Sequence, residues 1–196
     1  MSATSLAGHP WRRNRLTTII CINLFTLTFP FIMLGIASHG FVGRSRELGA
    51  LRRAFDSPQA SLVHVAGLPG VGKTRTALQA AGDFRAVYHR APPLPEPHQR
   101  AALARDLIAA LDPPAHAAPA PDELSWEQVF ALLARSVPED RPLVLVVDDA
   151  HRWDESRARC RTALAGALAG ARQDGRPIHV VLVAPEIPSQ GLPDEP

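Results

Sequence analysis

Lysine is nearly absent from this chain of 196 residues, which has 20 arginines but a single lysine, Lys73. The two cysteines, Cys21 and Cys160, are too few for a disulfide framework or a four-ligand zinc site. No acidic residue precedes Glu47, and from there to its end the chain has 16 basic and 19 acidic residues. The net charge of +2 therefore comes from the N-terminal segment, and the remainder lacks the basic surface that would indicate nucleic acid as a partner.

The N-terminal segment, residues 1–40, differs in composition from the rest and contains a long apolar run at 16–37. This run has 22 residues and no charged side chain, and about 20 apolar residues in a helix cross the core of a bilayer. We therefore expect an N-terminal hydrophobic helix that anchors the protein in a membrane. A start of translation at Met33 would explain the change in composition equally well, and the two interpretations remain open. A cleaved signal peptide fits less well, because the run is long and lacks a good cleavage site.

Beyond residue 40, patterns typical of strands and helices alternate. Short apolar runs predict strands at 61–66, 84–89, 142–147 and 178–184, and helical patterns cover 73–81, 98–112, 125–137 and 155–172. Continuous apolar strands that alternate with helices are typical of a parallel sheet covered on both faces. We therefore predict a three-layer α/β core over 41–186, followed by a proline-rich tail at 187–196.

Residues 67–74, which follow the predicted strand 61–66 and open the predicted helix 73–81, read Gly-Leu-Pro-Gly-Val-Gly-Lys-Thr. They match the phosphate-binding loop G-x-x-x-x-G-K-S/T. Glycines let successive backbone N–H groups point at one anion, and the following helix adds positive potential at its N-terminus. Lys73 supplies a point charge for the β- and γ-phosphates, and the Thr74 hydroxyl is a candidate Mg²⁺ ligand. An arginine is a poor replacement at such a position, which accounts for the one lysine. The candidate nucleotide-binding residues here are Gly67, Gly70, Val71, Gly72, Lys73, Thr74 and Arg75.

Two adjacent carboxylates, Asp148 and Asp149, follow the most hydrophobic predicted strand. A carboxylate at the end of such a strand completes a magnesium site, so Asp148 is the second candidate metal ligand beside Thr74. Asp149 stands where a carboxylate can orient the attacking water, and with Lys73 it is a candidate catalytic residue. Because Asp is one methylene shorter than Glu, we expect slow hydrolysis. A guanine-reading N-K-x-D motif is excluded, because no asparagine follows Asn23 and no second lysine exists, so ATP with Mg²⁺ is favoured.

The segments Phe-Val-Gly-Arg-Ser-Arg-Glu-Leu at 41–48, the phosphate-binding loop and Val-Val-Asp-Asp-Ala-His at 146–151 together resemble P-loop ATPases of the AAA+/STAND type. The origin-recognition-like AAA ATPase domains belong to this group. The resemblance implies that Val42, Gly43 and Arg44 contact the adenine and ribose, and that the protein self-associates or works with an effector domain. A fifth core strand and the helical lid of such proteins are not recognisable after the fourth predicted strand. We therefore expect the P-loop fold to be incomplete at its C-terminus and truncated before the lid.

These observations predict an ATP-binding, AAA+/STAND-like domain that acts as a nucleotide-dependent switch with weak, Mg²⁺-dependent hydrolysis. The alternative is a non-hydrolysing adaptor, or a truncated paralogue, that acts by protein interaction. The need for ATP predicts a cytoplasmic core, which the apolar run at 16–37 would attach to a membrane.

Overall fold

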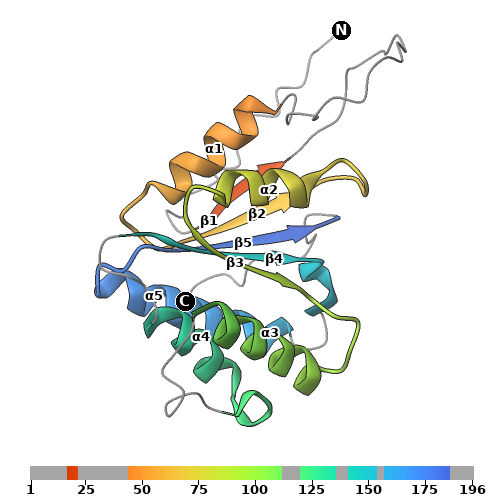
Figure 1. Cartoon of the computed structure of the whole chain (residues 1–196), viewed down its shortest axis with the longest axis vertical. Helices are drawn as coiled ribbons and strands as arrows, with labels where there is room; N and C mark the ends of the chain where they lie inside the picture. Colours follow the sequence, from red (N-terminus) through yellow and green to blue (C-terminus); the bar gives the residue numbers. More distant parts are fainter. Residues whose placement is uncertain (1–16, 22–43, 112–119, 136–140, 154–156, 186–196) are drawn as a thin grey trace, which may run out of the picture.

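The computed structural model describes residues 17–21, 44–111, 120–135, 141–153 and 157–185 (Figure 1). The described strands form one parallel sheet in the order β1-β2-β5-β4-β3. The strands are β1 (Thr17–Cys21), β2 (Ser61–Ala66), β3 (Arg85–Arg90), β4 (Leu143–Asp148) and β5 (Ile178–Ala184). The helices are α1 (Ser45–Phe55), α2 (Lys73–Ala81), α3 (Glu96–Leu111), α4 (Trp126–Arg135) and α5 (Arg157–Gln173), with short 3₁₀ turns η2 (Pro121–Glu123) and η3 (Ala150–Trp153).

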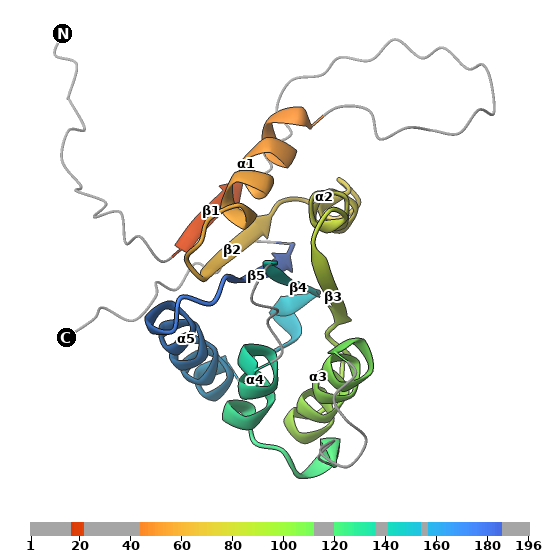
Figure 2. The ribbon, with the colours of Figure 1, turned by 60° about the vertical axis from the view of Figure 1, so that its left-hand side comes forward.

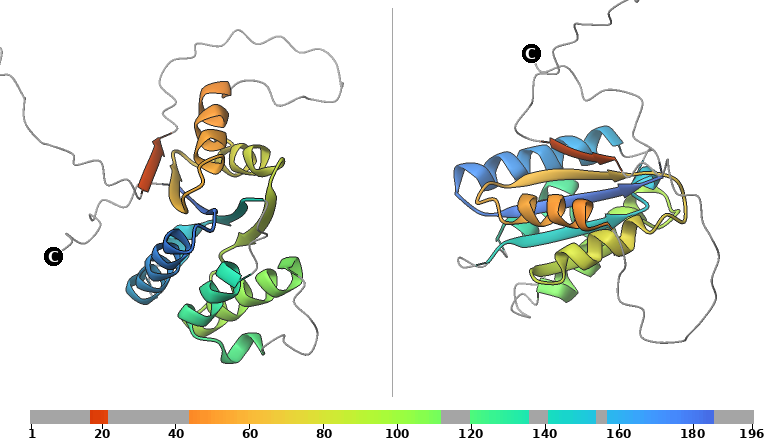
Figure 3. Two further views of the ribbon diagram at one scale, coloured as in Figure 1. Left: turned by 90° about the vertical axis from the view of Figure 1, so that its left-hand side faces the viewer. Right: turned by 90° about the horizontal axis from the view of Figure 1, so that it is seen from above.

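The sheet is the middle of three layers, as the two views in Figure 3 and the turned view in Figure 2 show. Helices α1 and α2 cover one face, and α3, α4 and α5 cover the other. Strand β4 explains why both faces need a cover: Val144 and Val146 pack toward α1 and α2, while Leu143, Leu145 and Val147 pack toward the other three helices. All five of these side chains are fully buried. The predicted three-layer α/β fold with a parallel sheet is confirmed.

The four strands and four helices predicted beyond residue 40 are all present, with bounds that differ by three residues or fewer. Helix α1 was not among them. Its core contacts come from few side chains, with Leu51 and Phe55 fully buried one turn apart and Gly49 inside the helix. The pattern was nevertheless readable, because Leu48, Leu51 and Phe55 recur at helical spacing and arginine is a good helix former, so α1 could have been predicted.

The prediction of an N-terminal hydrophobic helix is wrong for its first residues, because Thr17–Cys21 form the edge strand β1. This strand runs parallel to β2, from Thr17 opposite Leu62 to Cys21 opposite Ala66 (Figure 3). Two effects favour the strand: threonine and isoleucine are branched at Cβ and favour extended backbone, and the free edge of β2 offers hydrogen-bonding groups. The remainder of the predicted helix, 22–37, and the tail at 187–196 lie outside the described residues.

Two further expectations change with this strand. Among the described residues the sheet has five strands, and the additional one, β1, precedes the four predicted strands in the chain. Within the described segments, no helix is long and apolar enough to cross a membrane. The predicted transmembrane helix and membrane anchorage are therefore not supported.

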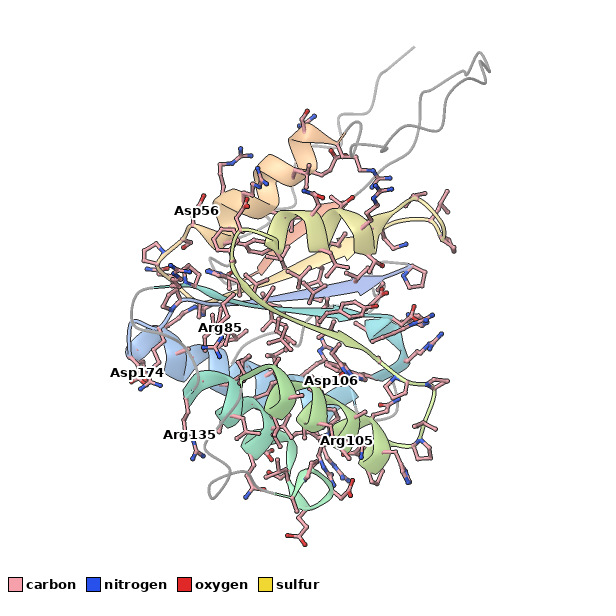
Figure 4. The ribbon with its side chains drawn as sticks, viewed as in Figure 1. Asp56, Arg85, Arg105, Asp106, Arg135 and Asp174 are labelled. Atoms are coloured by element: carbon pink, nitrogen blue, oxygen red, sulfur yellow. The ribbon has the colours of Figure 1, made fainter. Side chains whose placement is uncertain are left out.

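Two arginines bond carbonyl groups near the ends of helices α3 and α4. Arg85, at the start of β3, donates to the carbonyl oxygen of Leu111 at the end of α3, at 3.3 Å (Figure 4). Arg176 donates to the carbonyl oxygen of Ala134 near the end of α4, at 2.7 Å. Carbonyl groups in the last turn of a helix have no partner within the helix, and a cation there also opposes the negative end of the helix dipole. Arg85 thus ties α3 to the edge strand β3, and Arg176 ties α4 to the turn before the central strand β5.

Candidate functional site

The candidate site lies where the carboxyl ends of β2 and β4 meet the N-terminus of α2. In an open parallel sheet, ligands bind beyond this edge. The loop from Gly67 to Gly72 connects β2 to α2, and Gly70 and Gly72 have φ angles of 77° and 81°. A Cβ atom at either position would meet nothing within 4 Å, so the left-handed backbone, and not crowding, requires glycine there.

Lys73 is the first residue of α2, and only 9% of its side chain is exposed. Its ammonium donates to the carbonyl oxygens of Gly67 and Leu68, both at 2.9 Å. Burial lowers the pKa of Lys73 below its ordinary value, and the charge of Arg44 acts in the same direction, whereas Asp148 opposes it. The two hydrogen-bond acceptors are neutral, so the positive charge at the loop is not cancelled by a directly bonded carboxylate. It is available for an anion.

Asp148, the last residue of β4, is brought to Thr74 on α2 from 74 positions away in the sequence. The Thr74 hydroxyl donates to Oδ1 of Asp148 at 2.9 Å, and the backbone N–H of Asp149 donates to the same oxygen at 3.0 Å. A hydroxyl and a carboxylate are hard oxygen donors, and Mg²⁺ is usually held by one or two carboxylates together with substrate phosphates. The donor set therefore fits Mg²⁺.

Tyr88 on β3 reaches the same carboxylate from the other side. Its hydroxyl donates to Oδ2 of Asp148 at 3.2 Å, although 43% of the side chain is exposed. Burial, the charge of Asp148 and the hydrogen bond to that residue raise the pKa of Tyr88 above its ordinary value, so the phenol keeps its proton at neutral pH. Both oxygens of Asp148 thus have donors.

Asp149 is held by two arginines from different elements. Nε of Arg90, at the end of β3, lies 3.1 Å from Oδ2 of Asp149, and a guanidinium nitrogen of Arg152, in η3, lies 3.2 Å from the same oxygen. The backbone of Asp149 is left-handed, with φ of 55°, which is uncommon for a residue with a side chain. This carboxylate oxygen faces two positive groups, which compete for its lone pairs with any water that Asp149 would orient.

Arg44 lies against the phosphate-binding loop, since its guanidinium donates to the carbonyl oxygen of Val71. Another of its nitrogens, a terminal one, is buried without a hydrogen-bond partner among the described residues. Arg75 is exposed on the first turn of α2. Val42 and Gly43, which the resemblance assigned to the base, lie outside the described residues.

Comparison with known proteins decides the family. The sequence model for the AAA ATPase domain matches residues 40–183, which is most of the chain. The chain belongs to the AAA ATPase domain family. Among solved structures, the Walker-type ATPase PABY2304 of Pyrococcus abyssi is 19% identical with a TM-score of 0.55, and the match covers 72% of this chain and 45% of that one. A search of curated proteins found no match.

Two structures from origin-recognition and related proteins share the fold of this AAA ATPase domain. Drosophila ORC, in a structure bound to DNA, is 21% identical with a TM-score of 0.54, and the match covers 76% of this chain and 38% of that one. Cdc6p from Pyrobaculum aerophilum is 22% identical with a TM-score of 0.51, covering 78% of this chain and 41% of that one. The chain thus spans less than half the length of these neighbours, and identities this low show the fold alone.

The structure of this AAA ATPase domain brings together Lys73, Thr74, Asp148 and Asp149, all of which were predicted from motifs. Sequence reasoning missed Tyr88, Arg90 and Arg152. A signal for two of them exists, because β3 is parallel to β4 with Arg90 opposite Asp148, so residues at the end of the predicted strand 84–89 must lie beside the carboxylates. Arg152 stands three residues after Asp149 in a turn that the sequence does not define.

Proposed function

We propose that this AAA ATPase domain binds ATP with Mg²⁺ at the loop between β2 and α2 and acts as a nucleotide-dependent switch with weak hydrolysis. The observation that carries the proposal is the convergence of Lys73, Thr74 and Asp148 at one end of the sheet. A lone glycine-rich turn can arise by chance. A turn whose lysine, threonine and strand-end aspartate all meet is much harder to obtain without selection for phosphate and metal.

Each residue has a separate role in the proposed binding. The backbone N–H groups of the loop and the N-terminus of α2 cradle the phosphates. Lys73 exchanges its bonds to the Gly67 and Leu68 carbonyls for phosphate oxygens, so its charge is neutralised only when the ligand is present. Thr74 and Asp148 are the residues that would hold Mg²⁺. When bound, this cation would offset the negative charge that develops on the phosphates.

The proposal of weak hydrolysis is supported by Asp149. Its carboxylate is shorter than that of Glu, and Arg90 and Arg152 both contact its Oδ2. To orient a water molecule, Asp149 must give up at least part of this pairing. The same pairing favours a second candidate function, in which the domain binds ATP but does not hydrolyse it and acts as an adaptor through protein interactions.

Equilibrium binding of ATP, with and without MgCl₂, followed by measurement of phosphate release, tests the proposal. We expect Mg²⁺ to strengthen binding to the native chain, Lys73→Ala to bind much more weakly, and Asp148→Asn to lose mainly the effect of Mg²⁺. Phosphate release should be slower than about 1 s⁻¹, the low end for enzymes. Equal binding by the native chain and Lys73→Ala would count against the site. Retained binding with no phosphate release in long incubations would select the adaptor.

Limited proteolysis tests the switch separately. A switch requires that ATP and ADP stabilise different conformations, because a ligand shifts an equilibrium only by its differential affinity for the two states. We expect a non-hydrolysable ATP analogue and ADP to give different cleavage patterns in the native chain. Identical patterns at saturating concentrations of both ligands would exclude the switch while leaving nucleotide binding intact.

A further inference from the structure

Tyr88 is the one tyrosine of the chain, and its place in the sheet explains how it reaches the site. It lies on β3, the edge strand on the side of β4, opposite Val146 in the register. Two residues further along, Arg90 lies opposite Asp148, so the backbone of Tyr88 is two residues short of the position opposite Asp148. The long side chain of Tyr88 covers this distance, and its hydroxyl donates to Oδ2 of Asp148 at 3.2 Å.

The donors around Asp148 distinguish its two carboxylate oxygens. Oδ1 accepts hydrogen bonds from the Thr74 hydroxyl and from the backbone N–H of Asp149, whereas Oδ2 accepts one from Tyr88. The terminal torsion of an aspartate is soft and nearly two-fold, so a carboxylate without donors on both sides samples a broad range of orientations. Three donors, from α2, from the next residue and from β3, restrict that range, and Tyr88 is the one on the Oδ2 side.

A purely structural explanation for Tyr88 is also available, since aromatic residues are common on edge strands. This explanation fits poorly with how exposed the side chain of Tyr88 is. Tyr88 is 43% exposed, is among the more exposed large hydrophobic residues described, and does not belong to either core cluster. What its hydroxyl contacts is a carboxylate that faces Thr74.

We propose that Tyr88 is a positioning residue that orients Asp148 for Mg²⁺ through its hydroxyl. This inference rests on the proposed function, because it assigns a residue to the metal side of the same nucleotide site. Tyr88 touches neither nucleotide nor cation in this proposal and acts through Asp148. Its hydrogen bond keeps Oδ1 directed toward Thr74, so that both oxygen donors face one cation.

The test compares native protein with Tyr88→Phe, which removes only the hydroxyl. ATP binding is measured by calorimetry without divalent cation and over a series of Mg²⁺ concentrations. Replacement of groups that orient a metal ligand typically lowers metal affinity, and for an exposed donor that water partly replaces we expect a loss of about three- to tenfold. The Mg²⁺ concentration for half of the effect should rise by that factor, while binding without Mg²⁺ stays unchanged.

The matched control is Leu94→Ala, which changes an exposed side chain in the loop just beyond the same strand. It should leave both kinds of binding unchanged. If Tyr88→Phe has the Mg²⁺ dependence of the native chain, or a stronger Mg²⁺ affinity, the inference is overturned. A Leu94→Ala variant with the same loss as Tyr88→Phe would also overturn it, because the effect would then belong to the strand and not to the hydroxyl.

A spectroscopic readout tests the contact without nucleotide. Because the chain has one tyrosine, ¹³C at the ring carbon that bears the hydroxyl gives a single NMR resonance. We expect Asp148→Asn to shift this resonance, since the charged acceptor is lost, and an unshifted resonance would overturn the inference. Failure of the proposed function has a different signature: the native chain and Lys73→Ala would bind ATP equally or not at all, whatever residue stands at 88.

Discussion

Replacement of Lys73 by alanine should strongly reduce stabilisation by nucleotide while leaving the empty protein nearly as stable as before. Lys73 is 9% exposed, and its ammonium bonds two carbonyl groups at 2.9 Å. Loss of these bonds is offset in two ways. Water reaches the freed carbonyls, because the neighbouring Leu68 is 65% exposed, and the cost of burying the ammonium disappears with it. We expect a change in the free energy of unfolding of about 1 kcal/mol or less without ligand.

The stabilisation of the folded state by bound ATP is larger, and it can be calculated from the affinity and the ligand concentration. At an ATP concentration 100 times the dissociation constant, a ligand that binds only the folded state stabilises it by about 2.7 kcal/mol. For a domain of this size, that corresponds to a rise in melting temperature of about 5–10 °C. A charge-assisted contact to phosphate is worth about 1.5–3 kcal/mol, so Lys73→Ala should weaken binding by about 10- to 150-fold. At the same ATP concentration, the variant should gain about 1 °C or a few degrees at most.

Thermal unfolding with and without Mg²⁺–ATP measures both terms. The control is Arg105→Ala, which removes an exposed positive charge on α3, a helix on the face of the sheet that α1 and α2 do not cover (Figure 4). It should show the full rise in melting temperature. A Lys73→Ala variant that is stabilised as much as the native chain would refute the assignment of Lys73 to the phosphates. A large drop in melting temperature without ligand would show instead that the lysine holds the loop together.

Three further predictions concern other parts of the fold. Arg90→Gln should raise the rate of phosphate release, because it frees Asp149 from one of its two arginines. The gain should be only about two- to fivefold, because an exposed ion pair is weak. A gain that persists when Asp149 is also changed to Asn would contradict the pairing as its cause. Burial lowers the pKa of His179 to about 4, so the unfolded state binds the extra proton between pH 6.5 and 4 and stability falls as the pH drops through this range. Urea unfolding at pH 7 and 5 should show a smaller fall for His179→Gln, and equal falls would exclude His179 as a source. Deletion of residues 1–32 removes β1 and should lower the urea midpoint, since β2 loses a hydrogen-bonded neighbour; an unchanged midpoint would show that β1 adds no stability.

The parts of the structure that follow from local patterns were predictable. The phosphate-binding loop is a contiguous motif with a strand before it and a helix after it, and the apolar run at 142–147 needs a cover on both faces. Asp148 and Asp149 follow that run directly. Within each motif, sequence neighbours are also spatial neighbours. The contact between Asp148 and Thr74, 74 positions apart, follows because both motifs stand at the carboxyl ends of parallel strands, where ligands bind.

The parts that were missed depend on pairing between distant segments. The backbone preference of Thr17–Cys21 for extended structure was outweighed by the length of the apolar run in which it lies, and only the free edge of β2 decides the outcome. Arg90 reaches Asp149 because β3 and β4 are paired in one particular register, and a shift by one residue would turn its side chain to the other face. Helix α1 is a different case, because Leu48, Leu51 and Phe55 recur at helical spacing, so its omission was an oversight of a local pattern.

The single lysine makes the candidate site chemically addressable. Reagents that acylate amines meet only one lysine in the whole chain, and it stands in the phosphate-binding loop. Burial lowers the pKa of Lys73, which increases the share of neutral, nucleophilic amine at a given pH. Phosphates bound over this amine would shield it and favour its protonated form. The rate at which mass spectrometry detects a modified Lys73 is therefore a direct measure of how often the loop is occupied, with no label introduced by mutation.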